Sequence, residues 1–324
     1  MKNMPKHQQG VALITILIMI ALATILAASI AKKQRFTAEA TQSFLRQNQA
    51  MQYAQSGESF FAELLADDAK NADSIDHLGE TWAQPMPAYP VEDGFVTGQL
   101  QDAARKFNIN NLLNLQGEVD EAAKAVFVQI LKHQNIPEQQ VEAVIDWMDA
   151  DDETVGPMGA EQSFYRGSQG GYIPANAPLE TIDELKLIRG FEAKVFYQLL
   201  PYLTALPRGA KININTASAE MLAALAPQAN VMLLETELKN RRDNGQYFNG
   251  VDDLFTVDGF VQLEPEYKEK LKSQLDVRSS YYDAYIRVEL SQRQRILYSR
   301  LVRQNDTTVA LLSREILPVY SQRF

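Results

Sequence analysis

The feature that most constrains the fold is an apolar run, Val11 to Ala31, that contains no charged residue. At the helical rise of about 1.5 Å per residue, this run reaches roughly 32 Å, enough to cross the hydrocarbon core of a bilayer. A polar leader, Met1 to Gly10, precedes the run, and three basic residues follow it within residues 32–35. The pattern predicts a body carried on a single N-terminal membrane helix.

Three interpretations of this run compete. A secretory signal peptide predicts a shorter apolar region ending in small residues, for which Ala27-Ala28-Ser29 is a weak match. A plain signal anchor leaves the lone glycine before the run unexplained. The third interpretation explains it: the leader is cut after Gly10 on the cytoplasmic side, and Val11 becomes the first residue of the mature chain. This resembles the class III signal of type IV pilins and pseudopilins, in which a prepilin peptidase cleaves after Gly and methylates the new terminus.

Position five of such a mature chain is occupied here by Thr15. Most proteins with this signal carry Glu there, and the resemblance implies that the Glu pairs with the N-terminal amine of a neighbouring subunit. A carboxylate within the bilayer is costly unless it is paired. A subunit that carries Thr15 instead need not dock in that way.

Composition narrows the function classes. The 324 residues suit one large domain or two to three small ones, and the net charge is −10. Nucleic-acid affinity comes mainly from neutralised phosphates, so DNA or RNA is a poor partner for this chain overall. With no cysteine and only three histidines, disulfides, thiolate chemistry and a His-rich metal site are excluded.

The periodicity of the remaining chain predicts its elements. One helix is expected over 32–68, continuous with the apolar run, and the Pro-rich stretch 84–90 ends the helical region. Two short strands, 94–102 and 105–113, are expected to form a hairpin. Residues 115–277 read as helical and carry 26 acidic and 14 basic residues. Period-two alternation at 284–290, 294–303 and 308–316 predicts an antiparallel meander.

These elements predict an α+β protein with a pilin-like fold, in which a long N-terminal helix packs on an antiparallel sheet. A large all-α insertion interrupts the sheet. The expected organisation is a leader at 1–10, a transmembrane helix at 11–31, a pilin-like domain at 32–114 and 278–324, and an inserted helical domain at 115–277.

Two motifs stand out in the insertion. In the first, residues 146–161, five carboxylates lie within the first eight positions and run into a Gly/Pro loop. Such crowding is repulsive unless a cation offsets it, and hard oxygen ligands suit Ca²⁺. An acidic, solvated loop that caps a helix remains open, because the spacing is not that of an EF-hand. A catalytic carboxylate pair lacks a neighbouring nucleophile or base, so we predict no enzyme activity.

The second motif occurs at 179–191 and again at 212–225, the latter followed by a turn at 258–260. Its order of helix, Gly-containing turn and helix is typical of helix-hairpin-helix (SAM-like) units, whose turns can hold a phosphate through backbone N–H groups. The acidic surroundings favour structural packing units. A membrane-anchored DNA receptor for uptake is the alternative.

Together these features resemble the protein K family of the general (type II) secretion pathway. The matching features are the leader ending at Gly10, Thr15 in place of Glu, and the segments 107–112, 146–153, 159–165 and 212–217. The resemblance implies an inner-membrane, single-pass subunit with a periplasmic body. It would nucleate and cap the pseudopilus with minor pseudopilins I and J, and its further partners would be other pseudopilins and the inner-membrane secretion platform. It also implies Ca²⁺ in the folded body, for which the candidate ligands are Asp149, Asp151, Asp152, Glu153 and Glu161.

Overall fold

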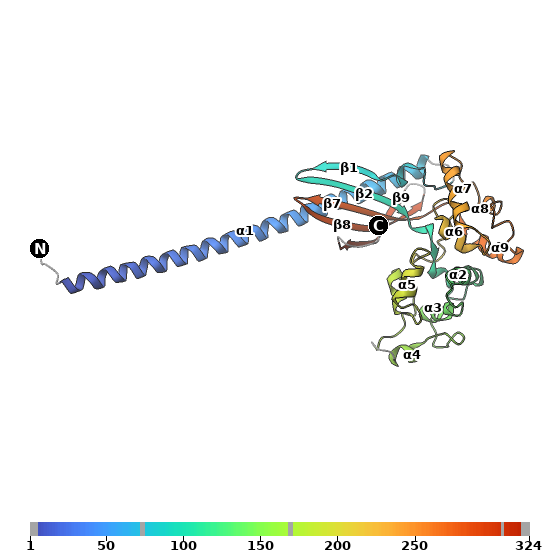
Figure 1. Ribbon diagram of the computed structural model, residues 1–324, viewed down its shortest axis with the longest axis horizontal. Helices are drawn as coiled ribbons and strands as arrows, with labels where there is room; N and C mark the ends of the chain where they lie inside the picture. The colour runs from blue at the N-terminus through green and yellow to red at the C-terminus, as the bar shows by residue number, and fades with distance from the viewer. Residues whose placement is uncertain (1–5, 72–74, 168–170, 306–307, 319–324) are drawn as a thin grey trace.

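The computed structural model describes residues 6–71, 75–167, 171–305 and 308–318. Its longest element is α1 (Lys6–Asn71), a single helix of 66 residues. The stretch from Val11 is long and apolar enough to cross a membrane, with a mean hydropathy of 2.9 over its most apolar window. The helix predicted over 32–68, continuous with the apolar run, is confirmed. Figure 1 shows the N-terminal half of α1 projecting away from the rest of the molecule.

A five-stranded antiparallel sheet packs on the C-terminal half of α1, with strand order β1-β2-β7-β8-β9. The strands are β1 (Met86–Val91), β2 (Gly94–Asp102), β7 (Tyr281–Leu290), β8 (Arg293–Asn305) and β9 (Thr308–Leu317). The predicted meander of the last three strands is confirmed. The connection between β8 and β9 lies partly outside the described residues.

The helix and the sheet join through small residues at helical spacing. Ala50, Ala54 and Phe61 are buried on one face of α1, because positions three, four and seven apart share a helix face. Between them Gly57 lies directly over β7, where a Cβ would come within 2.9 Å of a methyl carbon of Ile286. A residue without a side chain therefore lets α1 approach the sheet closely.

The predicted hairpin of strands 94–102 and 105–113 is wrong. β2 forms as expected, but it pairs with β1 from the Pro-rich stretch, and Tyr89 lies opposite Val96. β1 is an edge strand with Pro87 and Pro90, a place where missing N–H donors are tolerated. Residues 107–113 instead pack in the core of the helical body.

That body lies at the end of the molecule far from the N-terminus (Figure 1). Its α-helices are α2 (Glu121–His133), α3 (Gln140–Met148), α4 (Gln162–Gly167), α5 (Ala193–Leu199), α6 (Ala219–Leu225), α7 (Val231–Asp243), α8 (Val251–Leu254) and α9 (Pro265–Ser273). Short strands pair β3 (Phe107–Asn108) with β4 (Leu203–Thr204), and β5 (Ile212–Asn213) with β6 (Leu275–Asp276). The 3-10 helices are η1 (Thr81–Ala83), η2 (Ala103–Arg105), η3 (Ile109–Leu112) and η4 (Ile182–Leu187).

A buried carboxylate joins the body to the sheet. Asp102, at the end of β2, accepts hydrogen bonds from the hydroxyls of Thr216 and Ser279 and from the side-chain amide of Asn213. The backbone N–H of Ala104 donates a fourth, at 2.7 Å. Since Asp102 and Asn213 are almost fully buried, this network fixes how the body sits on the sheet.

Candidate cation site in the helical body

The acidic motif folds into a loop that connects α3 to α4. Asp146 lies in the last turn of α3, and Asp149 follows the helix as its C-cap. Glu161 directly precedes α4, and its backbone carbonyl accepts a hydrogen bond from the Phe164 N–H at 2.9 Å. The loop thus begins and ends at one place in the body.

Three carboxylates converge there. Asp146, Asp149 and Glu161 each present an oxygen that lies within 4.8 Å of an oxygen of the other two. Oxygens that bind one Ca²⁺ at 2.3–2.6 Å are separated by no more than about 5 Å. The separation therefore suits a shared cation of this kind.

The convergent oxygens are left without hydrogen-bond partners. Asp146 is fully buried and Glu161 is 4% exposed. Both side-chain oxygens of Glu161, together with Asp146 Oδ2 and Asp149 Oδ1, receive no hydrogen bond from any residue that the structure describes. Buried polar atoms almost always have a partner. Four orphaned oxygens in one place match the donor set that a hard cation takes.

The electrostatics of the site reflect its burial and its crowded carboxylates. Burial, followed by the charges of Asp146 and Asp149, raises the pKa of Glu161 to about 7. Burial and the nearby charge of Asp151 raise the pKa of Asp149 to about 6. Burial also raises the pKa of Asp146, although the Val155 N–H donates to its Oδ1 at 2.9 Å. A bound cation would favour the ionised form of all three groups.

Of the five predicted ligands, the structure brings together only Asp149 and Glu161. The side chains of Asp151, Asp152 and Glu153 are exposed, and Asp151 Oδ1 accepts a hydrogen bond from the Glu153 N–H. Asp146, which joins this group, was not among the predicted candidates. Its spacing of three from Asp149 was the available signal, because residues three apart at a helix end share one face.

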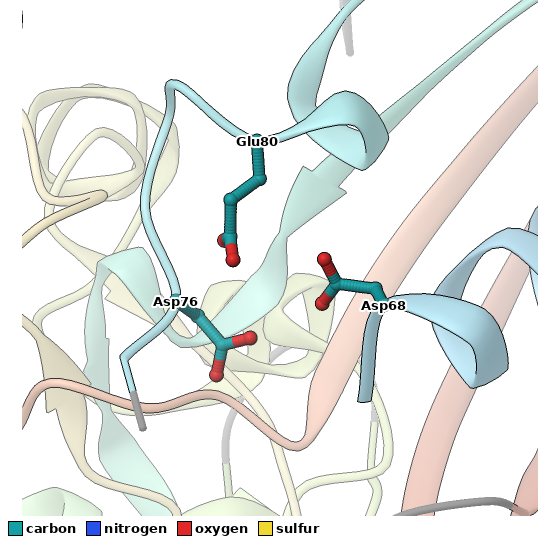
Figure 2. A group of neighbouring side chains, drawn as sticks. All are labelled: Asp68, Asp76 and Glu80. Carbon is teal, nitrogen blue, oxygen red and sulfur yellow. The ribbon is translucent and has the colours of Figure 1, made fainter. Parts of the chain in front are cut away.

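A second carboxylate group, Asp68, Asp76 and Glu80, lies where α1 ends beside η1 (Figure 2). Its carboxylates already have partners. Arg303 Nη2 lies 2.9 Å from Asp76 and 3.4 Å from Asp68, and the Trp82 indole N–H donates to Glu80 at 2.8 Å. The guanidinium of Arg303 fills the role of a cation, and we interpret this group as a structural joint.

The predicted processing site lies within α1, whose backbone is helical through Gly10 and Val11. The side chains of residues 1–10, the predicted leader, lie outside the described part of the chain. Thr15 is exposed, and its hydroxyl donates to the Ala12 carbonyl at 2.9 Å. Thr15 thus satisfies its polar group within its own helix.

The two segments predicted as helix-hairpin-helix units differ from each other. The first forms η4, a turn at Gly190 and α5, while the second forms β5, a loop and α6. An open cleft of about 830 Å³ lies between α6 and α7. Four basic and three acidic residues line it: Arg105, Lys106, Lys239, Arg242, Glu220, Glu235 and Asp243. The lining is therefore of mixed charge.

The fold and the site define a class: pilin-like proteins whose membrane-length helix carries an antiparallel sheet and a helical body with a cluster of converging carboxylates. Two sequence profiles of the family described as type II secretion system (T2SS), protein K, match residues 105–208 and 212–278. The chain is 30% identical to the type II secretion system protein K of Pseudomonas aeruginosa, over 97% of this chain and 94% of that protein. This chain belongs to the type II secretion system protein K family.

Two further comparisons agree. Protein K of Klebsiella pneumoniae is 33% identical over 72% of this chain and 74% of that protein. A solved structure titled the GspK-GspI-GspJ complex from the enterotoxigenic Escherichia coli type 2 secretion system includes a chain of similar fold. The TM-score is 0.73 at 23% identity, covering 86% of this chain and 99% of that one.

Proposed function

We propose that this chain is the minor pseudopilin at the tip of the type II secretion pseudopilus, where it nucleates and caps assembly with minor pseudopilins I and J. Membership of the protein K family supports this proposal, as does the likeness to a chain solved in a GspK-GspI-GspJ complex. The observation that carries it is the wide helical body at the far end of α1 (Figure 1). Such a body leaves little room for another subunit to stack above it.

The membrane end of α1 supplies the assembly contacts in this proposal. The large apolar side chains from Val11 to Ile30 are about half or more exposed in the isolated chain. In a bilayer they would pack against lipid and partner helices. Removal of the leader after Gly10 by prepilin peptidase, with methylation of Val11, would leave this helix as the mature N-terminus. The body would then lie in the periplasm, on a single-pass inner-membrane anchor.

Thr15 supports placement at the first position of the filament. Because its hydroxyl is bonded within α1, the residue needs no partner amine from a subunit above it. A buried Glu would need one. Further pseudopilins would then add below this chain through the secretion platform, and the growing filament would push proteins through the outer membrane. This role is structural and requires no catalysis.

Ca²⁺ is the cation that we propose for the body. Asp146, Asp149 and Glu161 would hold it, and its charge would offset three crowded carboxylates, two of which are buried. Binding to the folded state alone raises stability by mass action. The ion would therefore rigidify the loop between α3 and α4 in a chain that has no disulfide to do so.

Co-purification tests the assembly proposal. We expect the tagged full-length chain, expressed with minor pseudopilins I and J and extracted in detergent, to retain both partners through size-exclusion chromatography. Elution of the chain alone would contradict the proposal. The DNA-receptor alternative predicts retention on a DNA column that weakens steeply with salt. The two helix-hairpin-helix-like segments are expected to act as packing units, so we expect no such retention.

A further inference from the structure

Arg189 follows η4 and extends from the first helix-hairpin-helix-like segment to the acidic loop. Its guanidinium Nη1 donates a hydrogen bond to the Gly159 carbonyl at 2.9 Å. The same guanidinium lies over the ring of Phe164, 4.8 Å from its centroid. Its backbone N–H donates to the Tyr165 hydroxyl at 3.2 Å. One arginine therefore contacts the chain on both sides of Glu161.

The contact with Gly159 lies directly beside the cation site. Gly159 is buried against Asp146, and a Cβ at this position would overlap the Asp146 carboxylate. Arg189 therefore binds the carbonyl of Gly159, which packs against Asp146 and lies two residues before Glu161. Any displacement of Gly159 would move Glu161 relative to Asp146.

Arg189 does not neutralise the site. Within the described chain it forms no ion pair, and its hydrogen bonds go to a carbonyl and a hydroxyl. Its charge therefore does not compete with a cation for the orphaned oxygens.

We propose that Arg189 is a positioning residue for the cation site, holding residues 159–165 so that Glu161 faces Asp146 and Asp149. This inference rests on the proposed Ca²⁺ site. It also gives the segment 179–191 a role that a helix-hairpin-helix unit would not predict. The segment holds the loop of the proposed Ca²⁺ site in place through Arg189. Replacing a residue that orients a metal ligand without touching the metal typically weakens metal affinity by about 10- to 100-fold.

Calcium affinity of the full-length chain, measured in detergent by isothermal titration with Ca²⁺ alone, tests this role. We expect Arg189→Ala to weaken binding at least about tenfold. Arg189→Lys, which keeps one donor for the Gly159 carbonyl, should recover most of that loss. Arg166→Ala is the matched control, because Arg166 lies in α4 of the same region but is exposed. It should bind as the unaltered chain does.

The outcomes separate the two proposals. If the unaltered chain binds Ca²⁺ and Arg189→Ala binds it within twofold, the positioning role is overturned and the site stands. A lower melting temperature without ion, at unchanged affinity, would assign Arg189 a merely structural role and overturn the proposal too. If the unaltered chain binds no Ca²⁺, the site fails and the role of Arg189 fails with it. Should Arg189→Ala not fold, the Lys variant and Arg189→Gln carry the same comparison.

Discussion

At the residue scale, Glu161 is the most informative side chain in the body. Its two orphaned oxygens meet the carboxylates of Asp146 and Asp149 in a buried place. Folding concentrates three like charges there, which is unfavourable unless protons or a cation join them. The same arrangement that costs stability without an ion would provide the affinity of the proposed Ca²⁺ site.

Replacing a ligand should separate these two effects. In Glu161→Gln we expect Ca²⁺ to lose most of the rise in melting temperature that it gives the unaltered chain, because the site keeps only two carboxylates. Without the ion, the variant should melt at or above the temperature of the unaltered chain. Differential scanning calorimetry with Ca²⁺ and with a chelator measures both. The control is Glu153→Gln, since Glu153 is exposed; an equal loss of the Ca²⁺ effect in it would contradict the assignment.

A second residue, Asp68, should make stability depend on pH. Burial, followed by the charge of Glu80, raises the pKa of Asp68 to about 6. Its pKa in the folded state is thus above its ordinary value of 3.8. Asp68 therefore contributes favourably to the stability of the folded state below about pH 4, and this contribution is lost as the pH rises through about 6.

Asp68→Asn should therefore change stability in a pH-dependent way. We expect the difference in the free energy of unfolding, variant minus unaltered chain, to be more favourable at pH 7.5 than at pH 4.5 by on the order of 1 kcal/mol. Urea unfolding at the two pH values checks this. The neighbouring Asp67→Asn, which removes an exposed pair with Lys70, is the control. An Asp68→Asn difference that does not vary with pH would contradict the prediction.

At the scale of elements, the chain shows which signals sequence carries and which it does not. Continuous helical periodicity predicted α1, and period-two alternation predicted β7, β8 and β9. The edge strand β1 was missed because its prolines signal a break, and only pairing with β2 makes it a strand. The predicted hairpin was wrong because the alternation at 107–109 reflects burial in the core of the helical body. A local sequence pattern shows that a residue is buried, but it does not show in which domain.

The candidate site follows the same logic. Crowding of acidic residues indicated the region and two members of the converging carboxylate group, Asp149 and Glu161. Convergence depends on where the loop returns, so the exposed positions Asp151, Asp152 and Glu153 were indistinguishable from ligands by spacing alone. The role of Arg189 depends on a contact across thirty residues, and no local motif carries that information.

The attachment of α1 to β9 rests on one buried charge. Glu58 on α1 accepts hydrogen bonds from Arg314 on β9, at 2.9 Å for Nε and 2.5 Å for Nη2, and from the Ser299 hydroxyl. Arg314 and Ser299 hold its pKa below the ordinary value despite burial, which acts in the opposite direction. This pair fixes an edge strand to the helix that carries the molecule.

Glu58→Gln should loosen that attachment. We expect a loss of about 2–3 kcal/mol in the free energy of unfolding, the cost of weakening charged hydrogen bonds at a buried position. The matched control is Glu39→Gln, which breaks the exposed Arg35–Glu39 pair on the same helix and should cost about 0.5 kcal/mol or less. Urea unfolding measures both, and equal effects would contradict the assignment.

At the scale of the whole molecule, the chain is a long helix, α1, that carries a sheet and a helical body at one end (Figure 1). Its apolar end is membrane-length, its middle packs on a sheet, and its body lies beyond the sheet (Figure 1). A filament of such chains can grow only from below if the helical body blocks the space above. The proposed tip position would thus follow from this shape.

Processing of the N-terminus belongs to this scale, because it defines which end enters the filament. With prepilin peptidase present, the mature chain should begin at Val11 and carry one added methyl group. Gly10→Leu should leave the leader attached. Intact-mass measurement of the purified chains distinguishes these products. An unaltered chain whose mass still includes residues 1–10 would contradict cleavage after Gly10, and a Gly10→Leu chain whose mass lacks them would contradict the need for the glycine.

The central claim is that this chain occupies one end of the pseudopilus. The most direct measurement is immunogold electron microscopy of assembled pseudopili, with an antibody raised against the helical body. The account predicts gold at a single end of each filament. Gold spaced along the filament length, or filaments that form in normal number and carry no gold, would contradict it.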